Sequence, residues 1–223
     1  VADIEKSDTT ALSTPEASPV SRLVEEQSDA IEKEDLGDKL ARDPEGNTLS
    51  IIVLVAMIAS AMWALLNYRQ VKTTPRSDTW KWAIPVLCVV GLGVAGYLSY
   101  VETTHVEAVC GPVGDCNTVQ QSKYAMLFGV LPVGVLGIIG YIGILAAWVV
   151  NTYGKKEWRN LATVAIFGMS TFGLLFSIYL TFLEPFVIGA TCIWCLSSAV
   201  ITTAVFWLSL PRGKEAMSLL ARK

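Results

Sequence analysis

Residues 189–210 read GATCIWCLSSAVITTAVFWLSL and contain no charged side chain. A transmembrane α-helix needs about 20 consecutive, predominantly apolar residues, so this segment is long enough to cross a bilayer. Cys192 and Cys195 stand near its start as a Cys-x-x-Cys pair, which places two sulfurs one helical turn apart and close enough to bridge. The segment therefore predicts a membrane helix that carries two thiols at one mouth.

Four further apolar runs have a similar length. Hydrophobic residues make up 52% of the 223 positions, charged residues make up only 17%, and the mean hydropathy is +0.48. Such a composition belongs in lipid rather than around a soluble core. We therefore expect an all-α membrane protein with five spanning helices, the other four formed by residues 49–68, 80–100, 126–150 and 161–183.

The first 48 residues differ sharply from the rest of the chain. They have a net charge of −8 and no aromatic residue, whereas residues 49–223 have a net charge of +5. Polar, acidic segments of this kind cannot bury enough apolar surface to fold alone. We expect a disordered acidic tail over residues 1–48, with a fluctuating amphipathic helix over residues 20–40 as the alternative.

Basic residues predict how the five helices are oriented. They cluster in three places: the linker at residues 69–79 with Lys81 just beyond it, the connection at residues 155–159, and the tail at residues 211–223. The positive-inside rule makes all three sites cytoplasmic. The acidic tail, the loop at residues 102–125 and both cysteine pairs then lie on the opposite, extracytoplasmic side.

A second cysteine pair lies in the predicted outer loop. Cys110 and Cys116 could exchange a disulfide with Cys192 and Cys195, and the amino end of a helix is expected to lower the pKa of the Cys192 thiol. Two other interpretations stay open, namely a zinc ion bound by four thiolates and two inert structural disulfides. Cys88, alone in the middle of an apolar run, is expected to be a small buried hydrophobe.

No other catalytic pattern competes with the cysteines. The single histidine, His105, excludes ordinary multi-histidine metal sites, and no basic stripe with interleaved aromatic residues suggests nucleic-acid binding. Glycines recur every three residues from Gly134 to Gly143, which is typical of close packing between membrane helices.

Three motifs, in this order, resemble the vitamin K epoxide reductase family in its bacterial branch. They are CGPVGDCNTVQQSKYAMLFG at residues 110–129, PVGVLG at residues 132–137, and CIWC at residues 192–195. The resemblance covers about residues 81–210 and is to members without a fused thioredoxin-like domain. The acidic tail and the first apolar run lie outside it.

The resemblance implies a four-helix catalytic bundle around a quinone, over residues 80–210, with residues 49–68 as one extra amino-terminal transmembrane helix. Cys195 would meet the quinone, which could be ubiquinone, menaquinone or phylloquinone, and Cys192 would exchange with the Cys110/Cys116 pair. That pair would take electrons from a thioredoxin-like partner on the extracytoplasmic side of a bacterial plasma membrane. The net result would be disulfide formation in exported proteins.

The same resemblance places Ser122 near the quinone and the active-site disulfide. We expect a short helix over residues 117–128 to carry it across the mouth of the bundle. The alternative is that Ser122 is a solvated residue on an amphipathic segment.

Two other functions remain open at this level. A DsbB-like oxidase would catalyse the same reaction, but its Cys-x-x-Cys lies in the first outer loop, whereas here it opens the last helix. A non-enzymatic membrane scaffold with structural disulfides is the other alternative.

Overall fold

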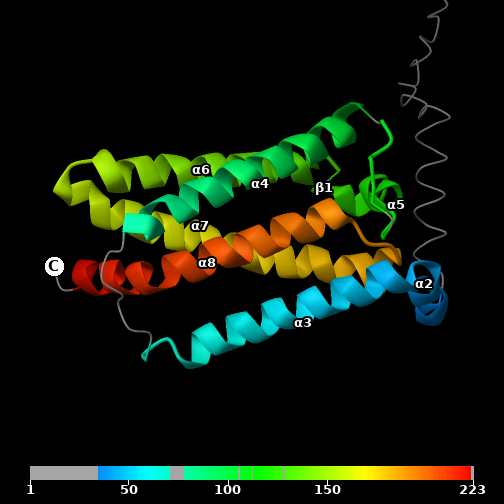
Figure 1. Cartoon of the computed structure of the whole chain (residues 1–223), viewed down its shortest axis with the longest axis horizontal. Helices are drawn as coiled ribbons and strands as arrows, with labels where there is room; N and C mark the ends of the chain where they lie inside the picture. The colour runs from blue at the N-terminus through cyan, green and yellow to red at the C-terminus, as the bar shows by residue number, and fades with distance from the viewer. Residues whose placement is uncertain (1–34, 71–77, 105, 112, 128, 222–223) are drawn as a thin grey trace, which may run out of the picture.

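The computed structural model describes residues 35–70, 78–104, 106–111, 113–127 and 129–221 (Figure 1). The part of the chain that it describes is almost entirely helical. Its two short strands, β1 (Met126–Leu127) and β2 (Leu131–Pro132), pair as one antiparallel hairpin. Most of the expected acidic tail, including most of residues 20–40, lies outside the described residues, as does His105.

Five of the described helices are long and apolar enough to cross a membrane. This confirms the prediction of an all-α membrane protein with five spans. The helices are α3 (Pro44–Leu66), α4 (Asp78–Thr104), α6 (Val133–Tyr153), α7 (Lys156–Leu183) and α8 (Ile193–Leu220).

Several boundaries differ from the expectation. Helix α3 begins at Pro44 rather than at residue 49, and helix α7 begins at Lys156 rather than at residue 161. Helix α8 continues through Pro211 to Leu220, so most of the expected carboxyl-terminal tail is helical.

The acidic tail is helical where it is described, because α2 (Leu36–Arg42) and the start of α3 are each capped by an aspartate side chain that accepts a backbone N–H. Helix α6 begins at Val133 rather than near residue 126, since Met126 pairs with Pro132 in the hairpin. A sequence pattern of apolar residues cannot distinguish a short apolar hairpin from the first turns of a helix.

Helices α4, α6, α7 and α8 form a bundle, and α3 packs on its outside against α7 and α8 (Figure 1). Inside the bundle, Ile84, Tyr141, Ile166 and Val205 are buried together. A second buried cluster joins α3 to the bundle through Met57, Leu174 and Phe206. The additional helix is therefore attached along its length by packing rather than held only by its loops.

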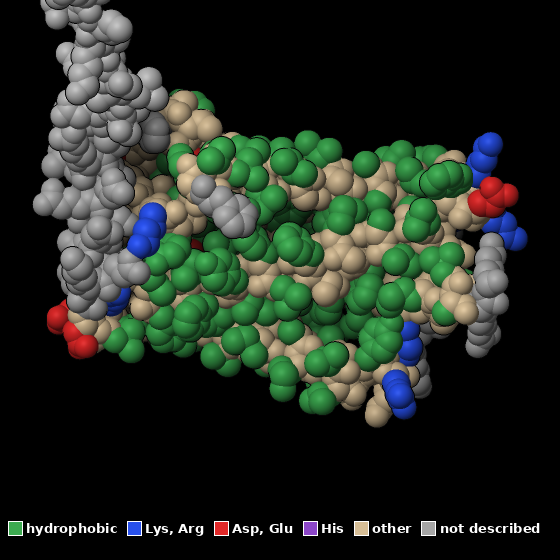
Figure 2. All heavy atoms as spheres, turned by 180° about the vertical axis from the view of Figure 1, so that it is seen from behind, with side chains coloured by type: hydrophobic (Ala, Val, Ile, Leu, Met, Phe, Trp, Pro, Cys, Tyr) green, Lys and Arg blue, Asp and Glu red, His purple; other side chains and the backbone are tan. Residues whose placement is uncertain are grey.

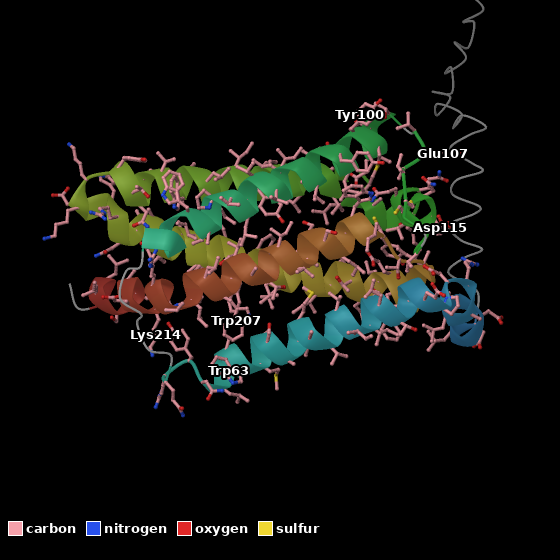
Figure 3. All side chains as sticks on the ribbon, in the orientation of Figure 1. Trp63, Tyr100, Glu107, Asp115, Trp207 and Lys214 are labelled. Carbon is pink, nitrogen blue, oxygen red and sulfur yellow. The ribbon has the colours of Figure 1, made fainter. Side chains whose placement is uncertain are left out.

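The surface separates into an apolar middle and charged ends. Figure 2 shows hydrophobic side chains over the length of the bundle, with Lys, Arg, Asp and Glu gathered at its two ends. Trp63 on α3 and Trp207 on α8 lie with ring centroids 5.1 Å apart at the end that also carries Lys214 (Figure 3). An apolar middle with charged residues and tryptophans toward the ends is the surface expected of a protein surrounded by lipid.

The opposite end of the bundle carries the short elements. Helix α5 (Cys116–Gln120) and the 3₁₀ turn η1 (Lys123–Ala125) lie in the outer loop, and the π-helical turn η2 (Glu184–Ile188) extends α7. The turn η2 ends at Gly189, whose φ is 78° and whose missing Cβ leaves room for the backbone of Lys39 on α2. A side chain at Gly189 would be strained and would also meet α2.

Candidate active site

Four of the five cysteines form a continuous series at this end of the bundle. The Cys116 thiol interacts with Cys110 on one side and with Cys192 on the other, and Cys192 interacts with Cys195. All four are free thiols in this structure. The two pairs that the sequence separates by most of the bundle are thus neighbours in space.

The outer loop is held so that Cys116 points toward α8. Asp115 caps α5 by accepting the N–H of Thr118 at 3.2 Å and its hydroxyl at 2.6 Å. The backbone N–H of Cys116 donates to the Cys110 sulfur at 3.2 Å. In Figure 3, Asp115 and Glu107 lie at the end of the bundle opposite Lys214.

An aromatic clamp joins the same loop to α8. The Trp194 indole N–H donates to the Val109 carbonyl at 3.0 Å, and the Val109 N–H donates to the Tyr97 hydroxyl at 2.6 Å. The rings of Tyr97 and Trp194 lie 4.7 Å apart. The tryptophan of the Cys-x-x-Cys motif therefore fixes the segment that precedes Cys110.

Burial and contacts between sulfur atoms determine the direction of the pKa shifts of the three thiols outside the membrane helices. Burial raises the pKa of Cys110 to about 11. The hydrogen bond with Cys192, together with burial, raises the pKa of Cys116. At Cys192 the bond with Cys116 lowers the pKa, but the bond with Cys195 and burial raise it more, so the expected lowering of the Cys192 pKa by the helix terminus is wrong.

An apolar cavity of about 500 Å³ lies within the bundle, and Cys195 stands in its wall. The Tyr141 hydroxyl in the wall hydrogen-bonds to two others, those of Ser198 at 3.0 Å and Thr202 at 3.1 Å. The remaining wall is mostly apolar or glycine, including Leu98, Leu136, Gly140, Met169, Phe172 and Phe176. A largely apolar cavity with few polar groups beside a redox thiol fits a planar, hydrophobic quinone.

A small cavity of about 40 Å³ also has Cys195 in its wall, together with residues of the outer loop. Ser122 lines it together with Cys195, although the Ser122 hydroxyl donates to the Val119 carbonyl at 2.7 Å. The structure thus brings Ser122 to the site, at the start of η1 and beyond a helix that ends at Gln120 rather than near residue 128. Phe128 lies outside the described residues.

Three polar residues of this small cavity were not singled out by sequence reasoning. The Gln120 amide lies 3.8 Å from both the Cys192 and the Cys195 sulfurs, and its Oε1 atom is buried with no hydrogen-bond partner among the described residues. Glu102 accepts the Gly134 N–H at 2.9 Å, and Glu184 is 2% exposed. An acidic residue that borders an apolar run was the available signal for both glutamates.

Two further expectations concerned cysteine: that Cys88 is a small buried hydrophobe, and that four thiolates could instead bind zinc. Cys88 is fully buried among the apolar side chains of the bundle core and is not part of the thiol series. Within the described ranges, no three His, Cys, Asp or Glu side chains are arranged to hold a metal ion.

Comparison with known proteins agrees with this geometry. Residues 82–210 match the sequence model of the vitamin K epoxide reductase family. The thiol-disulfide oxidoreductase LTO1 of Arabidopsis thaliana is 32% identical over 120 residues, which are 51% of this chain and 31% of that protein. The region that matches the family model contains most of α4 and α8, all of α6 and α7, the outer loop and all four thiols of the series.

Proposed function

Because the chain belongs to the vitamin K epoxide reductase family, we propose that this thiol oxidoreductase passes electrons from a thioredoxin-like partner to a membrane quinone. The observation that carries the proposal is the unbroken contact from Cys110 through Cys116 and Cys192 to Cys195, which ends in the wall of a large apolar cavity. An inert scaffold has no need for a thiol beside an apolar cavity.

The order of the sulfurs supports a sequence of exchange steps. In the oxidised protein, a partner thiolate attacks the half-buried Cys110 of a Cys110–Cys116 disulfide, so that Cys116 leaves as a thiolate. Cys116 then attacks Cys192 of a Cys192–Cys195 disulfide, and Cys195 leaves as a thiolate. A second thiolate of the partner then attacks the partner–Cys110 bond, which gives the partner its own disulfide and releases Cys110 as a thiolate. Cys110 attacks Cys116 of the Cys116–Cys192 bond, which restores the Cys110–Cys116 bond and leaves Cys192 and Cys195 reduced.

A quinone held in the large cavity would supply the two-electron acceptor that restores the second disulfide. Cys195 would face its ring, while Tyr141, Ser198 and Thr202 would offer the polar contacts on the cavity wall. The Oε1 atom of Gln120 is free to accept a further hydrogen bond, although it lies in the smaller cavity. The apolar lining would exclude water from the reacting sulfur.

Orientation and location extend the same proposal. The basic residues at 155–159 and 212–214 belong to the α6–α7 connection with the first turn of α7 and to the last part of α8, at the bundle end remote from α5 (Figure 1). Under the positive-inside rule this supports an extracytoplasmic active site. The protein would then act in a bacterial plasma membrane and support disulfide formation in exported proteins. The reversed order of the cysteine motifs speaks against a DsbB-like arrangement.

Quinone-dependent oxidation of a dithiol by the purified protein tests the proposal. Dithiothreitol and short-chain quinones of the three classes are supplied, and quinone absorbance is followed. The wild-type protein should reduce at least one quinone, Cys195→Ser should abolish the reaction, and Cys88→Ala should leave it nearly intact. Equal loss in Cys88→Ala and Cys195→Ser, or no reduction by the wild-type protein, would contradict it.

A further inference from the structure

We propose that Gln120 on α5 stabilises the thiolate of Cys195 during thiol exchange. The inference rests on the proposed function, since it assigns a residue to the step in which the loop pair reduces the Cys-x-x-Cys pair. In that step Cys116 attacks Cys192, and Cys195 leaves as a thiolate. Gln120 donates an amide N–H to the leaving sulfur and is therefore a catalytic residue of the exchange.

The side-chain amide of Gln120 reaches both sulfurs of the Cys-x-x-Cys pair. Its Nε2 atom donates one hydrogen bond to the Cys192 sulfur and one to the Cys195 sulfur, each with a nitrogen–sulfur distance of 3.8 Å. The other end of the amide, Oε1, is buried and has no hydrogen-bond partner among the described residues. A buried amide oxygen without a partner is costly, so the contact with the sulfurs explains this side chain better than a gain in stability does.

Gln120 and Cys116 lie on the same short helix. They are four residues apart in α5, a spacing that places two side chains on one face of an α-helix. Cys116 is fully buried in one cluster with Cys192. The placement of α5 against the bundle therefore brings the attacking sulfur and the hydrogen-bond donor to the Cys-x-x-Cys pair together.

The two cavities beside Cys195 disfavour a negative charge on its sulfur. The large cavity is mostly apolar, and the small one has Glu102 and Glu184 in its wall. Apolar surroundings do not solvate a thiolate, and an ionised carboxylate repels it. The described residues that line the two cavities include no lysine, arginine or histidine. A neutral N–H donor such as Gln120 is therefore the kind of group that stabilises a thiolate at this position.

The step balances without any transfer of a proton to or from Gln120. The Cys116–Cys192 bond forms, the Cys192–Cys195 bond breaks, and the electron pair of the broken bond stays on the Cys195 sulfur. The amide keeps its proton and donates a hydrogen bond to the new thiolate. Catalytic hydrogen bonds are often long in a resting protein and shorten as charge develops, which fits the distance of 3.8 Å.

Reduction kinetics of the two disulfides test the inference without any quinone. The full-length protein is oxidised with diamide so that both disulfides form, and excess dithiothreitol is then added. Samples are quenched with acid, unfolded and labelled with N-ethylmaleimide, and peptide mass spectrometry follows the appearance of free Cys110 and free Cys195. Free Cys110 reports reduction of the loop pair, whereas free Cys195 reports the exchange step.

Two variants of Gln120 remove the donor in different ways. Gln120→Met keeps the length of the side chain, and it should slow the release of Cys195 roughly tenfold while Cys110 is reduced at the wild-type rate, because a hydrogen bond to a charged sulfur is lost. Gln120→Glu, whose carboxylate accepts but cannot donate, should slow the release of Cys195 at least as much. Gln121→Met is the matched control, since Gln121 is exposed at the end of α5, and neither rate should change.

An unchanged release of Cys195 in Gln120→Met would overturn the inference. Equal slowing at Cys110 and Cys195 would also overturn it, because that result indicates a structural role in the loop. A wild-type rate in Gln120→Glu would do the same, since a side chain that cannot donate would then suffice. If Gln120→Met does not fold, Gln120→Glu decides alone.

Cys116→Ser separates this inference from the proposed function. It should release Cys195 only slowly, through direct attack by dithiothreitol, and release at the wild-type rate would contradict the relay itself. Slow exchange in Gln120→Met combined with no quinone reduction by the wild-type protein would support the inference and contradict the quinone acceptor. Quinone reduction by the wild-type protein with unchanged exchange in Gln120→Met would do the reverse.

Discussion

The thiol of Cys116 on α5 contacts the thiol of Cys192 at the start of α8, and this contact joins the outer loop to the membrane bundle. Without it, the two cysteine pairs would be separate redox centres. With it, one disulfide can be exchanged for another by movement of a single side chain. The contact therefore connects the accessible pair to the pair beside the cavity.

Exposure distinguishes the two cysteines of the loop pair. Cys110 is half-buried and Cys116 is fully buried, so a membrane-impermeant maleimide added to intact, reduced cells should label Cys110 far more than Cys116. A reporter fused to the carboxyl terminus of the chain should be cytoplasmic in the same cells. Labelling of Cys110 only after lysis would place the loop on the other side of the membrane.

The pH dependence of Cys110 follows from its environment. Since burial raises its pKa to about 11, only a small fraction is thiolate near pH 8. The alkylation rate of reduced Cys110 should rise about tenfold per pH unit between about pH 8 and about pH 10. A rate that levels off near pH 9, as for an unperturbed thiol, would contradict this expectation; a cysteine-containing peptide from the same loop is the control.

Asn47 on α3 is expected to stabilise the active-site turn. Its amide nitrogen donates to the carbonyls of Lys39 at 3.1 Å and Gly189 at 3.4 Å, and its oxygen accepts the Thr191 hydroxyl at 3.3 Å. Asn47→Ala would leave buried groups unpaired and should reduce the free energy of unfolding by roughly 1–3 kcal/mol.

Thermal unfolding in detergent measures the effect of Asn47→Ala. Thr48→Ala is the matched control, because its exposed hydroxyl bonds only within α3, to the Pro44 carbonyl. The control should change stability by less than about 0.5 kcal/mol. Equal effects of the two variants would show that the contacts of Asn47 with the turn do not stabilise the protein.

Ser122→Ala should weaken quinone-dependent turnover several-fold. Ser122 lines the small cavity beside Cys195, and its oxygen can accept a hydrogen bond there while its proton is donated to the Val119 carbonyl. Loss of a hydrogen bond that steadies the Cys195 thiolate or the quinone is expected to cost on the order of 1 kcal/mol. Ser197→Ala is the control, since the Ser197 hydroxyl also donates to a backbone carbonyl, that of Ile193 at 2.8 Å. Identical kinetics for both variants across a quinone titration would return Ser122 to a local structural role.

The general architecture was predictable because lipid imposes a simple rule. Spanning helices need long apolar runs, and five such runs predicted five helices with boundaries mostly within a few residues. The exceptions have local causes that hydropathy does not record. The hairpin before α6 is apolar like a helix, and α2 depends on the aspartate cap at Asp35 and on contact with η2.

The site was predictable only in part. Cysteine spacing identified all four thiols of the series, but it did not indicate that Cys116 rather than Cys110 faces Cys192. The pKa of Cys192 was misjudged because a helix terminus was considered without burial and the neighbouring thiols. The contact of the Ser50 hydroxyl on α3 with Glu184 Oε2, at 3.4 Å, was not predictable, since it depends on how α3 packs on α7.

Disulfide capture in double variants tests the order of the sulfurs most directly. Cys110→Ser/Cys195→Ser retains Cys116 and Cys192, whereas Cys116→Ser/Cys195→Ser retains Cys110 and Cys192. After mild oxidation and proteolysis, mass spectrometry should detect a Cys116–Cys192 linked peptide in the first variant and little or no Cys110–Cys192 peptide in the second. Equal capture in both variants, or capture only between Cys110 and Cys192, would contradict the relay from Cys110 through Cys116 to Cys192.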